Sequence, residues 1–329
     1  LKNLNPDQIA SLRSTQISAF TSAQIVVLTT DQIIALTSSQ VAALSSKQLA
    51  DMGSEQLNAL EADDLRALTS SQIAALKTAQ VAKLSSDQII ALASAQIGSL
   101  TSAQVAALTT AQLAVMELED LRALKVSSLQ TSQLVKLNTE QVAGLTTAQV
   151  ASLTSVQIAS LSSDQIIALE AEDLRSLTSS QLRALKTDQL VKLGAEQIAS
   201  LRGTQLSVLT TTQLNALTSD QIIALTTGQM ASLTSIQVAA LTTDQITAIE
   251  VDDLRALTSA QIAALKTAQV TKLTTDQIAG LTTAQVASLN SAQLQTLSNP
   301  QLASLDYEGL RALTSGQLAS LTSTQLKNL

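Results

Sequence analysis

Leu28-Thr29-Thr30-Asp31-Gln32-Ile33-Ile34-Ala35 is followed at once by Leu36-Thr37-Ser38-Ser39-Gln40-Val41-Ala42-Ala43, and this pair of octapeptides decides the fold. The same pattern of Leu, Thr or Ser, two variable residues, Gln, an aliphatic residue and two more variable residues continues along the whole chain. Its glutamine position recurs every eight residues from Gln8 to residue 120 and again from Gln133 to Gln325, with one shortened unit at residues 124–128 between them. We therefore expect one continuous repeat domain over residues 1–329.

A period of eight residues excludes the two simplest regular structures. In one long α-helix, eight residues turn by about 800°, so the leucine stripe would drift by about 80° per repeat and no face could stay buried. In a β-strand, side chains alternate between faces with a period of two. The large apolar residues of the octad are separated by five and three positions, so they would change face within each repeat.

Each octad instead carries a complete signal for the start of a helix. Thr or Ser at the N-cap with Gln three residues later is a capping box, in which the two side chains satisfy each other's backbone N–H groups. The Leu before the cap and the aliphatic residue after the Gln form a hydrophobic staple. Pro6 occupies a first helical position, where its missing N–H costs nothing. The sequence therefore predicts one very short helix per octad, with a corner at every Leu-Thr junction.

Helices this short are unstable in isolation, because ordering eight residues costs about 1.5 kcal/mol per residue and each octad buries only two large aliphatic side chains. Neighbouring octads must share a core, which is the principle of a solenoid. The predicted fold class is all-α, a solenoid (superhelix) of very short helices around a narrow axis of Leu, Ile, Val and Ala. We expect two octads per turn; three octads per turn is the alternative geometry.

The preference for Gln over Glu at the capping-box position needs its own explanation. Ionised Glu side chains stacked on successive turns would repel each other, whereas Gln both donates and accepts hydrogen bonds. We therefore predict partly buried ladders of amides in register, although duplication of an ancestral octad would also keep the residue constant. The representative ladder and capping residues are Gln32, Gln40, Gln80, Gln88, Gln165, Gln221, Gln245 and Gln277.

A charged cassette interrupts the consensus at intervals. It reads Glu61-Ala62-Asp63-Asp64-Leu65-Arg66 at its first occurrence and returns around Leu121, Leu174, Leu254 and, more loosely, Leu310. In three of the cassettes a lysine follows the leading Glu at a distance of two octads, so two octads per turn would place each Glu beside its Lys. The predicted contacts between turns or between chains involve Glu61, Arg66, Lys77, Glu170, Arg175, Lys186, Glu250, Arg255 and Lys266.

Three interpretations of the cassette remain open. The simplest is a solvated charged band, with acidic residues placed favourably at helix N-termini. Lateral contact between solenoids is the second. The third is a calcium site, with Glu61, Asp63, Asp64, Glu250, Asp252 and Asp253 as weak candidate ligands. These carboxylates are adjacent in first turns of helices and lack the spacing of a dedicated calcium loop.

Composition argues against several classes of function. The chain has no His and no Cys, so it lacks the commonest acid–base residue and the commonest soft metal ligands, and we predict no enzyme activity and no cofactor. A net charge of -7 argues against nucleic-acid binding. No apolar run approaches the roughly 20 residues of a membrane span, and no signal peptide is visible. Residues 1–4 and 326–329 share the sequence Leu-Lys-Asn-Leu, so we expect the chain to be a segment of a longer repeat protein.

The motif at residues 28–36, repeated over nearly the whole chain, resembles the octapeptide tracts of very large bacterial surface proteins of the haemagglutinin-like and adhesin-like kind. The resemblance implies an exported, extended protein at the cell surface or in the extracellular matrix. We accordingly expect a non-enzymatic structural protein that forms an extracellular fibre, an adhesin stalk or a biofilm scaffold in a bacterium. Lateral or end-to-end self-association and a cell-surface or matrix partner are expected with it. The alternative is a solenoid that binds a protein through its charged band.

Overall fold

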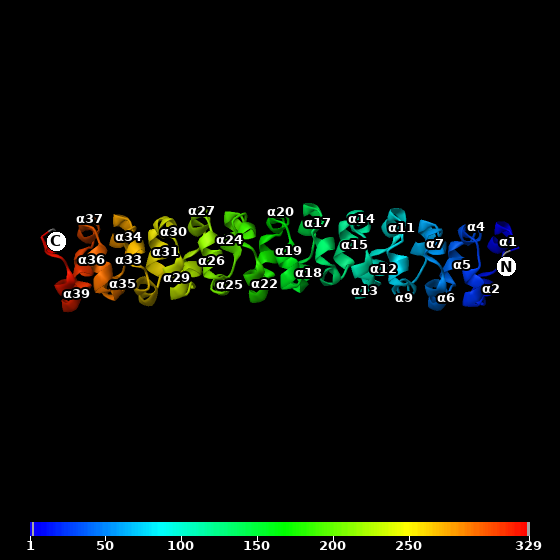
Figure 1. The fold of residues 1–329 in the computed structure, drawn as a ribbon, viewed down its shortest axis with the longest axis horizontal. Helices are drawn as coiled ribbons and strands as arrows, with labels where there is room; N and C mark the ends of the chain where they lie inside the picture. Colours follow the sequence, from blue (N-terminus) through cyan, green and yellow to red (C-terminus); the bar gives the residue numbers. More distant parts are fainter. Residues whose placement is uncertain (2, 328–329) are drawn as a thin grey trace. The chain divides into compact units, whose positions relative to one another are not determined.

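The computed structural model describes residue 1 and residues 3–327, so the predicted match between the chain ends falls partly outside the described residues. The chain forms two compact units, Leu1–Leu161 and Ser162–Leu329. In both units the described residues form short helices and no strand, as Figure 1 shows. The predicted all-α solenoid of very short helices is confirmed.

The helices of the first unit are α1 (Pro6–Ala10), α2 (Ser14–Ser18), α3 (Ser22–Val26), α4 (Thr30–Ile34), α5 (Ser38–Ala42), α6 (Ser46–Asp51), α7 (Ser54–Asn58), α8 (Ala62–Arg66), α9 (Ser70–Ala74), α10 (Thr78–Val81), α11 (Ser86–Ala91), α12 (Ser94–Ser99), α13 (Ser102–Ala107), α14 (Thr110–Ala114), α15 (Leu118–Ala123), the 3₁₀ turn η1 (Val126–Ser128), α16 (Thr131–Leu134), α17 (Thr139–Ala143), α18 (Thr147–Ser152) and α19 (Ser155–Ser160).

The helices of the second unit are α20 (Ser163–Ile167), α21 (Ala171–Ser176), α22 (Ser179–Ala184), α23 (Thr187–Leu190), α24 (Ala195–Ser200), α25 (Gly203–Leu206), α26 (Thr211–Ala216), α27 (Ser219–Ile223), α28 (Thr227–Ala231), α29 (Ser235–Ala240), α30 (Thr243–Ala248), α31 (Val251–Ala256), α32 (Ser259–Ala263), α33 (Thr267–Val270), α34 (Thr275–Ala279), α35 (Thr283–Ser288), α36 (Ser291–Thr296), α37 (Asn299–Ala303), α38 (Tyr307–Ala312), α39 (Ser315–Ser320) and α40 (Ser323–Leu326).

The corner between two helices is built by the Leu-Thr junction without help from glycine. At the end of α12, Leu100 has φ -55° and ψ 132°, and the N-cap Thr101 has φ -69° and ψ 159°. Two successive extended residues redirect the chain, and the capping box then starts the next helix at once. Among the described residues none has a positive φ, so the corner suits ordinary L-amino acids and can be repeated indefinitely.

The core of each unit is a narrow column of aliphatic side chains. In most octads the residue after the glutamine is fully buried, as Ile73 and Leu254 show, with no exposed surface. The leucine that closes each octad is nearly as well covered, since Leu76 is 4% exposed. Both large apolar positions of the octad therefore point to one axis, and the core is thin and aliphatic as the composition suggests.

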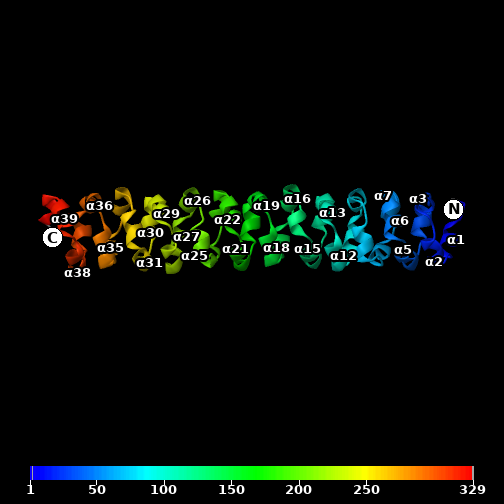
Figure 2. The same cartoon turned by 90° about the horizontal axis from the view of Figure 1, so that it is seen from below.

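The pairs of helices that pack most closely are three helices apart along the chain. In the first unit α9 contacts α12 and α12 contacts α15, and in the second α28 contacts α31 and α32 contacts α35. Within each unit the helices follow one another around the axis in Figures 1 and 2. The expectation of two octads per turn is therefore wrong. Two short helices would leave two sides of the apolar axis open to water, whereas three or more enclose it.

The shortened unit keeps its place in this arrangement. Residues 126–128 form the 3₁₀ turn η1, which packs against α13 on one side and α18 on the other. Val126 is 1% exposed and takes the core position of the missing aliphatic residue. A 3₁₀ turn needs fewer residues than an α-helical turn of the consensus octad, so the loss of three residues is absorbed locally.

Removing core volume should destabilise the chain far more than removing an exposed aliphatic group. Leu254→Ala deletes a fully buried side chain, and we expect a loss of about 2–5 kcal/mol in the free energy of unfolding. Ile223→Ala removes a side chain that is 45% exposed and should cost below about 1 kcal/mol. Urea denaturation followed by circular dichroism measures both, and equal losses would contradict the assignment of the core.

Candidate functional site

The recurring glutamine forms a bridge between two turns of the solenoid. Gln104 accepts a hydrogen bond at Oε1 from the backbone N–H of its own N-cap, Thr101, at 2.8 Å. Its Nε2 donates to the carbonyl oxygens of Leu76 (2.7 Å) and Ile73 (3.0 Å), which lie 28 and 31 residues earlier. One side chain therefore satisfies an N-terminal N–H of one helix and C-terminal carbonyls of a helix on the preceding turn, two classes of group that a short helix leaves unpaired.

This bridge explains the choice of Gln over Glu. A Glu carboxylate would accept from the N-cap N–H equally well, but it has no N–H to donate to the preceding turn. Gln104 is 1% exposed, so a carboxylate there would also place a buried negative charge against two carbonyl oxygens. Within the described part of the chain, no buried side-chain nitrogen or oxygen lacks a hydrogen-bond partner.

The predicted ladder residues occupy equivalent positions. The same bonds to carbonyls of an earlier turn are made by Gln32, Gln40, Gln80, Gln88, Gln221, Gln245 and Gln277. Gln165 accepts at 2.9 Å from the backbone N–H of its N-cap, Ser162. In these seven bridges the amides bond to backbone carbonyls of another turn and not to one another.

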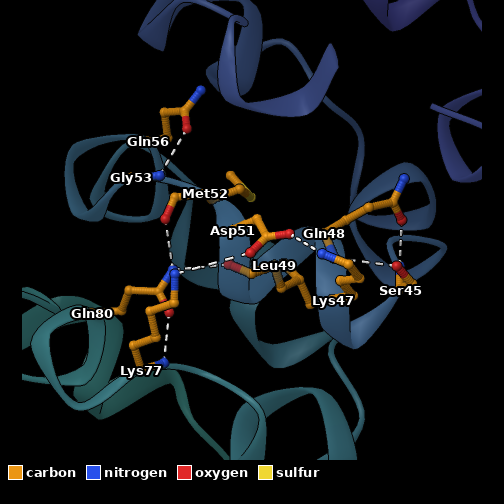
Figure 3. A network of polar contacts seen from close by, with 10 residues as sticks. All are labelled: Ser45, Lys47, Gln48, Leu49, Asp51, Met52, Gly53, Gln56, Lys77 and Gln80. Carbon is orange, nitrogen blue, oxygen red and sulfur yellow. Dashed lines mark hydrogen bonds and ion pairs between the residues drawn. The ribbon is translucent and has the colours of Figure 1, made fainter. Parts of the chain in front are cut away.

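A charged network in the first unit shows which residues the turns bring together (Figure 3). Lys47 Nζ lies 2.6 Å from Asp51 Oδ2, and Lys77 Nζ lies 4.0 Å from Asp51 Oδ1. The hydrogen bond from Lys47, aided by the Ser22 hydroxyl, lowers the pKa of Asp51. Beside it, Gln80 Nε2 donates to the carbonyls of Leu49 (2.8 Å) and Met52 (2.9 Å).

The network corrects the predicted pairing of each cassette Glu with the Lys two octads later. Lys77 faces Asp51, which lies on the preceding turn, and not Glu61. Within the described residues no ion pair joins Glu170 to Lys186 or Glu250 to Lys266, and all four side chains are exposed. The pairing fails because helices two octads apart do not face each other on adjacent turns.

The cassettes are the places where the glutamine bridge is replaced. Asp64 stands in the glutamine position and is 3% exposed. It accepts from the backbone N–H of Glu61 (3.3 Å) and from the hydroxyl of Ser38 (2.8 Å), 26 residues earlier. Asp120 accepts from Ser94 at the same separation, at 2.7 Å. The carboxylate thus receives a hydrogen bond from the preceding turn, where Gln would donate one.

Asp253 shows the electrostatic cost of this replacement. It is 5% exposed, and it accepts a hydrogen bond from the hydroxyl of Thr227, which also lies on the preceding turn. Burial raises the pKa of the Asp253 carboxyl, and the neighbouring Glu250 and Asp252 add to the rise. Sequence reasoning missed this role of the cassette aspartates. The signal in the sequence was the Asp alone, because Ser or Thr also stands 26 residues before ordinary glutamines such as Gln72 and Gln104.

The weak calcium candidates are not gathered into a site. Glu61, Asp63, Glu250 and Asp252 are exposed, whereas Asp64 and Asp253 are turned inward and hydrogen-bonded. Throughout residues 3–327, no group of three or more Asp or Glu side chains is arranged to hold a metal ion. Because these carboxylates are adjacent in sequence, they point to different sides of a short helix.

The cassette arginines join turns through the backbone in the first unit. Arg66 Nε donates to the carbonyl of Ala91 at 3.0 Å, and Arg122 Nε to that of Gly144 at 2.8 Å. In the second unit Arg175 and Arg255 are exposed, and the carbonyl of Arg175 accepts a hydrogen bond from Arg202. The cassette helices α21, α31 and α38 lie along one side of that unit, the lower edge in Figure 2.

Comparison with known proteins identifies the repeat. A family model described as the ALTTAQ repeat matches residues 1–38, 57–94, 113–155, 126–163, 166–203, 200–235 and 246–283, which together make up more than half of the chain. Residues 107–112 read Ala-Leu-Thr-Thr-Ala-Gln. No curated protein matches the chain. Among the described helices, none is both long enough and apolar enough to cross a membrane.

Replacing one bridging glutamine by glutamate tests the role of its amide nitrogen. Gln104→Glu keeps the oxygen that caps Thr101 and removes the donor to Leu76 and Ile73. We expect a loss of about 2 kcal/mol or more in unfolding free energy at pH 7. Gln16→Glu is the matched control, since Gln16 caps Arg13 at 2.9 Å and is exposed; its substitution should leave stability nearly unchanged in urea denaturation.

Asp253→Asn tests the buried carboxylate. A carboxyl whose pKa is raised by folding disfavours the folded state when ionised, so its penalty is full above the folded pKa and vanishes below the unfolded value. The variant should therefore have a higher urea midpoint than the wild type at pH 7, and the gap should close as the pH falls towards about 3. Asp220→Asn, at an exposed carboxylate, is the control. A pH-independent gap would contradict this account.

Proposed function

We propose that this chain, which belongs to the ALTTAQ repeat family, is a non-enzymatic structural protein that serves as a solenoid scaffold and spacer. The observation that carries the proposal is the glutamine bridge, which ties turn to turn with the same buried bonds along each unit. Such a chain grows by adding octads without any change in its local interactions, which is the property of a spacer of adjustable length.

The use of the polar side chains supports a structural role. The hydroxyl of Thr101 accepts from the backbone N–H of Gln104, and the same cap recurs at most octads, so the abundant Ser and Thr are already occupied in the repeat. A hollow of about 430 Å³ beside Gly53 is lined by Val26, Leu28, Thr30, Gly53, Ser54, Glu55 and Gln56. It holds a single carboxylate and no paired acid and base, so it offers no acid–base chemistry.

The setting we propose is the outside of a bacterial cell, in an extracellular fibre, an adhesin stalk or a biofilm matrix. The resemblance to octapeptide tracts of large surface proteins supports this location. The absence of cysteine and histidine also suits it, because such a scaffold has no thiol to oxidise and no imidazole to titrate between about pH 5 and 8. Self-association and attachment to a surface or matrix partner belong to the same proposal.

A second candidate function is a protein-binding module, and one observation favours it. In the second unit the cassette helices share a side, and the exposed charges Glu172, Arg175, Asp252 and Arg255 project from them. A row of such charges at intervals of whole octads suits a partner with complementary charges at a matching spacing. This surface would supplement a scaffold and does not require a different fold.

Changing the number of octads tests the scaffold proposal. Duplicating residues 210–265 adds seven whole octads and keeps the repeat frame. We expect small-angle X-ray scattering to give the same cross-section for both proteins and a greater length for the longer one, because every added turn makes the same bridges. An increased cross-section at constant length would contradict the spacer role.

The binding-module alternative is tested on the same purified protein. Capture of one defined partner that is lost in Glu250→Gln/Arg255→Gln, with unchanged scattering, would favour that alternative. Surface labelling of intact bacteria with an antibody to the repeat checks the proposed location, and protein detected only after lysis would overturn it.

A further inference from the structure

One side of the second unit carries exposed charges that its own residues do not pair. In α21 Glu172 stands in the first turn and Arg175 in the last, and in α31 Asp252 and Arg255 take the same places. All four side chains are exposed. None of them forms an ion pair within the described residues. These charges are therefore free to meet a second molecule.

The two cassette helices lie three turns apart on this side. α21 contacts α24, and α28 contacts α31. Gln229 of α28 donates to the carbonyls of Ile198 and Ala199 in α24, so α24 and α28 also face each other on adjacent turns. The helices α21, α24, α28 and α31 therefore follow one another along the stack, and Figure 2 shows α21 and α31 on its lower edge.

This side is divided lengthwise into an acidic edge and a basic edge. Because the chain winds around the axis in one direction, the four helices all cross this side the same way. Their first turns form one edge and their last turns the other, with exposed side chains that are acidic at Glu172, Glu196 and Asp252 and basic at Arg175, Arg202 and Arg255. Arg202 belongs to the basic edge because it donates to the carbonyl oxygen of Arg175.

Small residues lie between the long side chains of the two cassettes. Ala199 of α24 and Ala231 of α28 stand in the octad position of Arg175. Gly228 of α28 stands in the position of Glu172, is exposed, and a Cβ added to it would meet nothing within 4 Å. The surface between the cassettes is therefore open to the approach of another molecule.

We infer that this side is a contact surface between two copies of the chain, which lie parallel and side by side. A twofold axis along the stack places every residue at the same height as its own counterpart and sets the acidic edge of each copy against the basic edge of the other. Glu172 then meets Arg175 of the second copy, and Asp252 meets Arg255. An antiparallel pair would bring like charges together, which disfavours it.

The spacing of the cassettes is the reason for choosing a second copy as the partner. The cassettes at Leu65, Leu121, Leu174 and Leu254 are separated by 56, 53 and 80 residues. An unrelated protein would have to match each of these unequal intervals, whereas a parallel copy matches all of them by symmetry. This inference rests on the proposed scaffold function and assigns the surface through which scaffolds join laterally.

Salt provides the first test. Exposed ion pairs are screened by salt and contribute little individually, so the association should be weak and sensitive to ionic strength. Sedimentation equilibrium of the whole chain should show parallel dimers forming at about 0.05 M NaCl and an association about tenfold weaker at about 0.5 M.

Two charge-reversed variants test the pairing itself. Glu172→Arg/Asp252→Arg gives both edges of the cassettes a positive charge, and Arg175→Glu/Arg255→Glu gives both a negative charge. Each variant alone should associate about tenfold more weakly than the wild type at low salt, because like charges then face each other. An equimolar mixture of the two should restore the dimer. All four side chains are exposed, so each variant should keep the urea midpoint of the wild type.

The matched control and the orientation use the same side as reference. Asp188→Arg/Asp244→Arg reverses two exposed carboxylates on α23 and α30, outside the four helices, and should dimerise like the wild type. The chain has no cysteine, so Gly228→Cys places a single thiol on the contact surface. A short bismaleimide should crosslink two copies through this thiol and should not crosslink Asp188→Cys.

Three outcomes would overturn the inference. They are a wild-type chain that stays monomeric at low salt up to its solubility limit, a mixture of the reversed variants that associates no better than either alone, and a monomeric chain that captures a different protein through these charges. The last outcome would favour the binding-module alternative. The scaffold proposal fails separately, through a monomer whose cross-section grows at constant length when residues 210–265 are duplicated.

Discussion

The glutamine side chain that joins two turns is the interaction on which the rest of the structure depends. A helix of five or six residues leaves most of its backbone N–H and C=O groups without intrahelical partners. Gln104 satisfies one such N–H in its own helix and two buried carbonyls on the preceding turn. Because the unpaired backbone groups of one helix find their hydrogen-bond partners on another turn, these very short helices are stable only when the turns are stacked. The aliphatic core supplies most of the driving force, and the bridge supplies the register.

The cassettes show how the repeat tolerates departures from this arrangement. Asp64 and Asp253 stand in the glutamine position and turn inward, where a hydroxyl from the preceding turn donates to them. The direction of the hydrogen bond between turns is thereby reversed, and a buried charge is introduced at some cost to stability. The outward carboxylates and arginines of the same helices remain available to solvent. The glutamine bridge is therefore absent from the same helices that carry the exposed charged residues of the cassettes.

Features that depend on contacts within one octad could be predicted from the sequence, whereas contacts between turns could not. The capping box at Thr37 and Gln40 and the burial of Ile73 and Leu76 depend on residues within one octad, so the helix and its buried face could be predicted from the sequence. The partner of Lys77 and the hydroxyl donor to Asp64 lie on the preceding turn, at a distance fixed by the number of octads in a turn. The number of octads in a turn depends on how the short helices enclose the core. The expectation of two octads per turn therefore led to the wrong partners for the residues that meet between turns.

The sequence by itself determined the short helix, its corner and its apolar stripe, because each is encoded by neighbouring residues whose chemistry is complete within the octad. The tertiary structure alone decided which turns meet, where the glutamine nitrogen donates and how Asp253 comes to be buried beside a hydroxyl from another turn. The physical reason is that the angle at each corner is a continuous quantity, and small changes in it alter the residues that lie opposite one another. Because the sequence repeats, the corner angle is the same at each junction, but packing around the shared core determines its value.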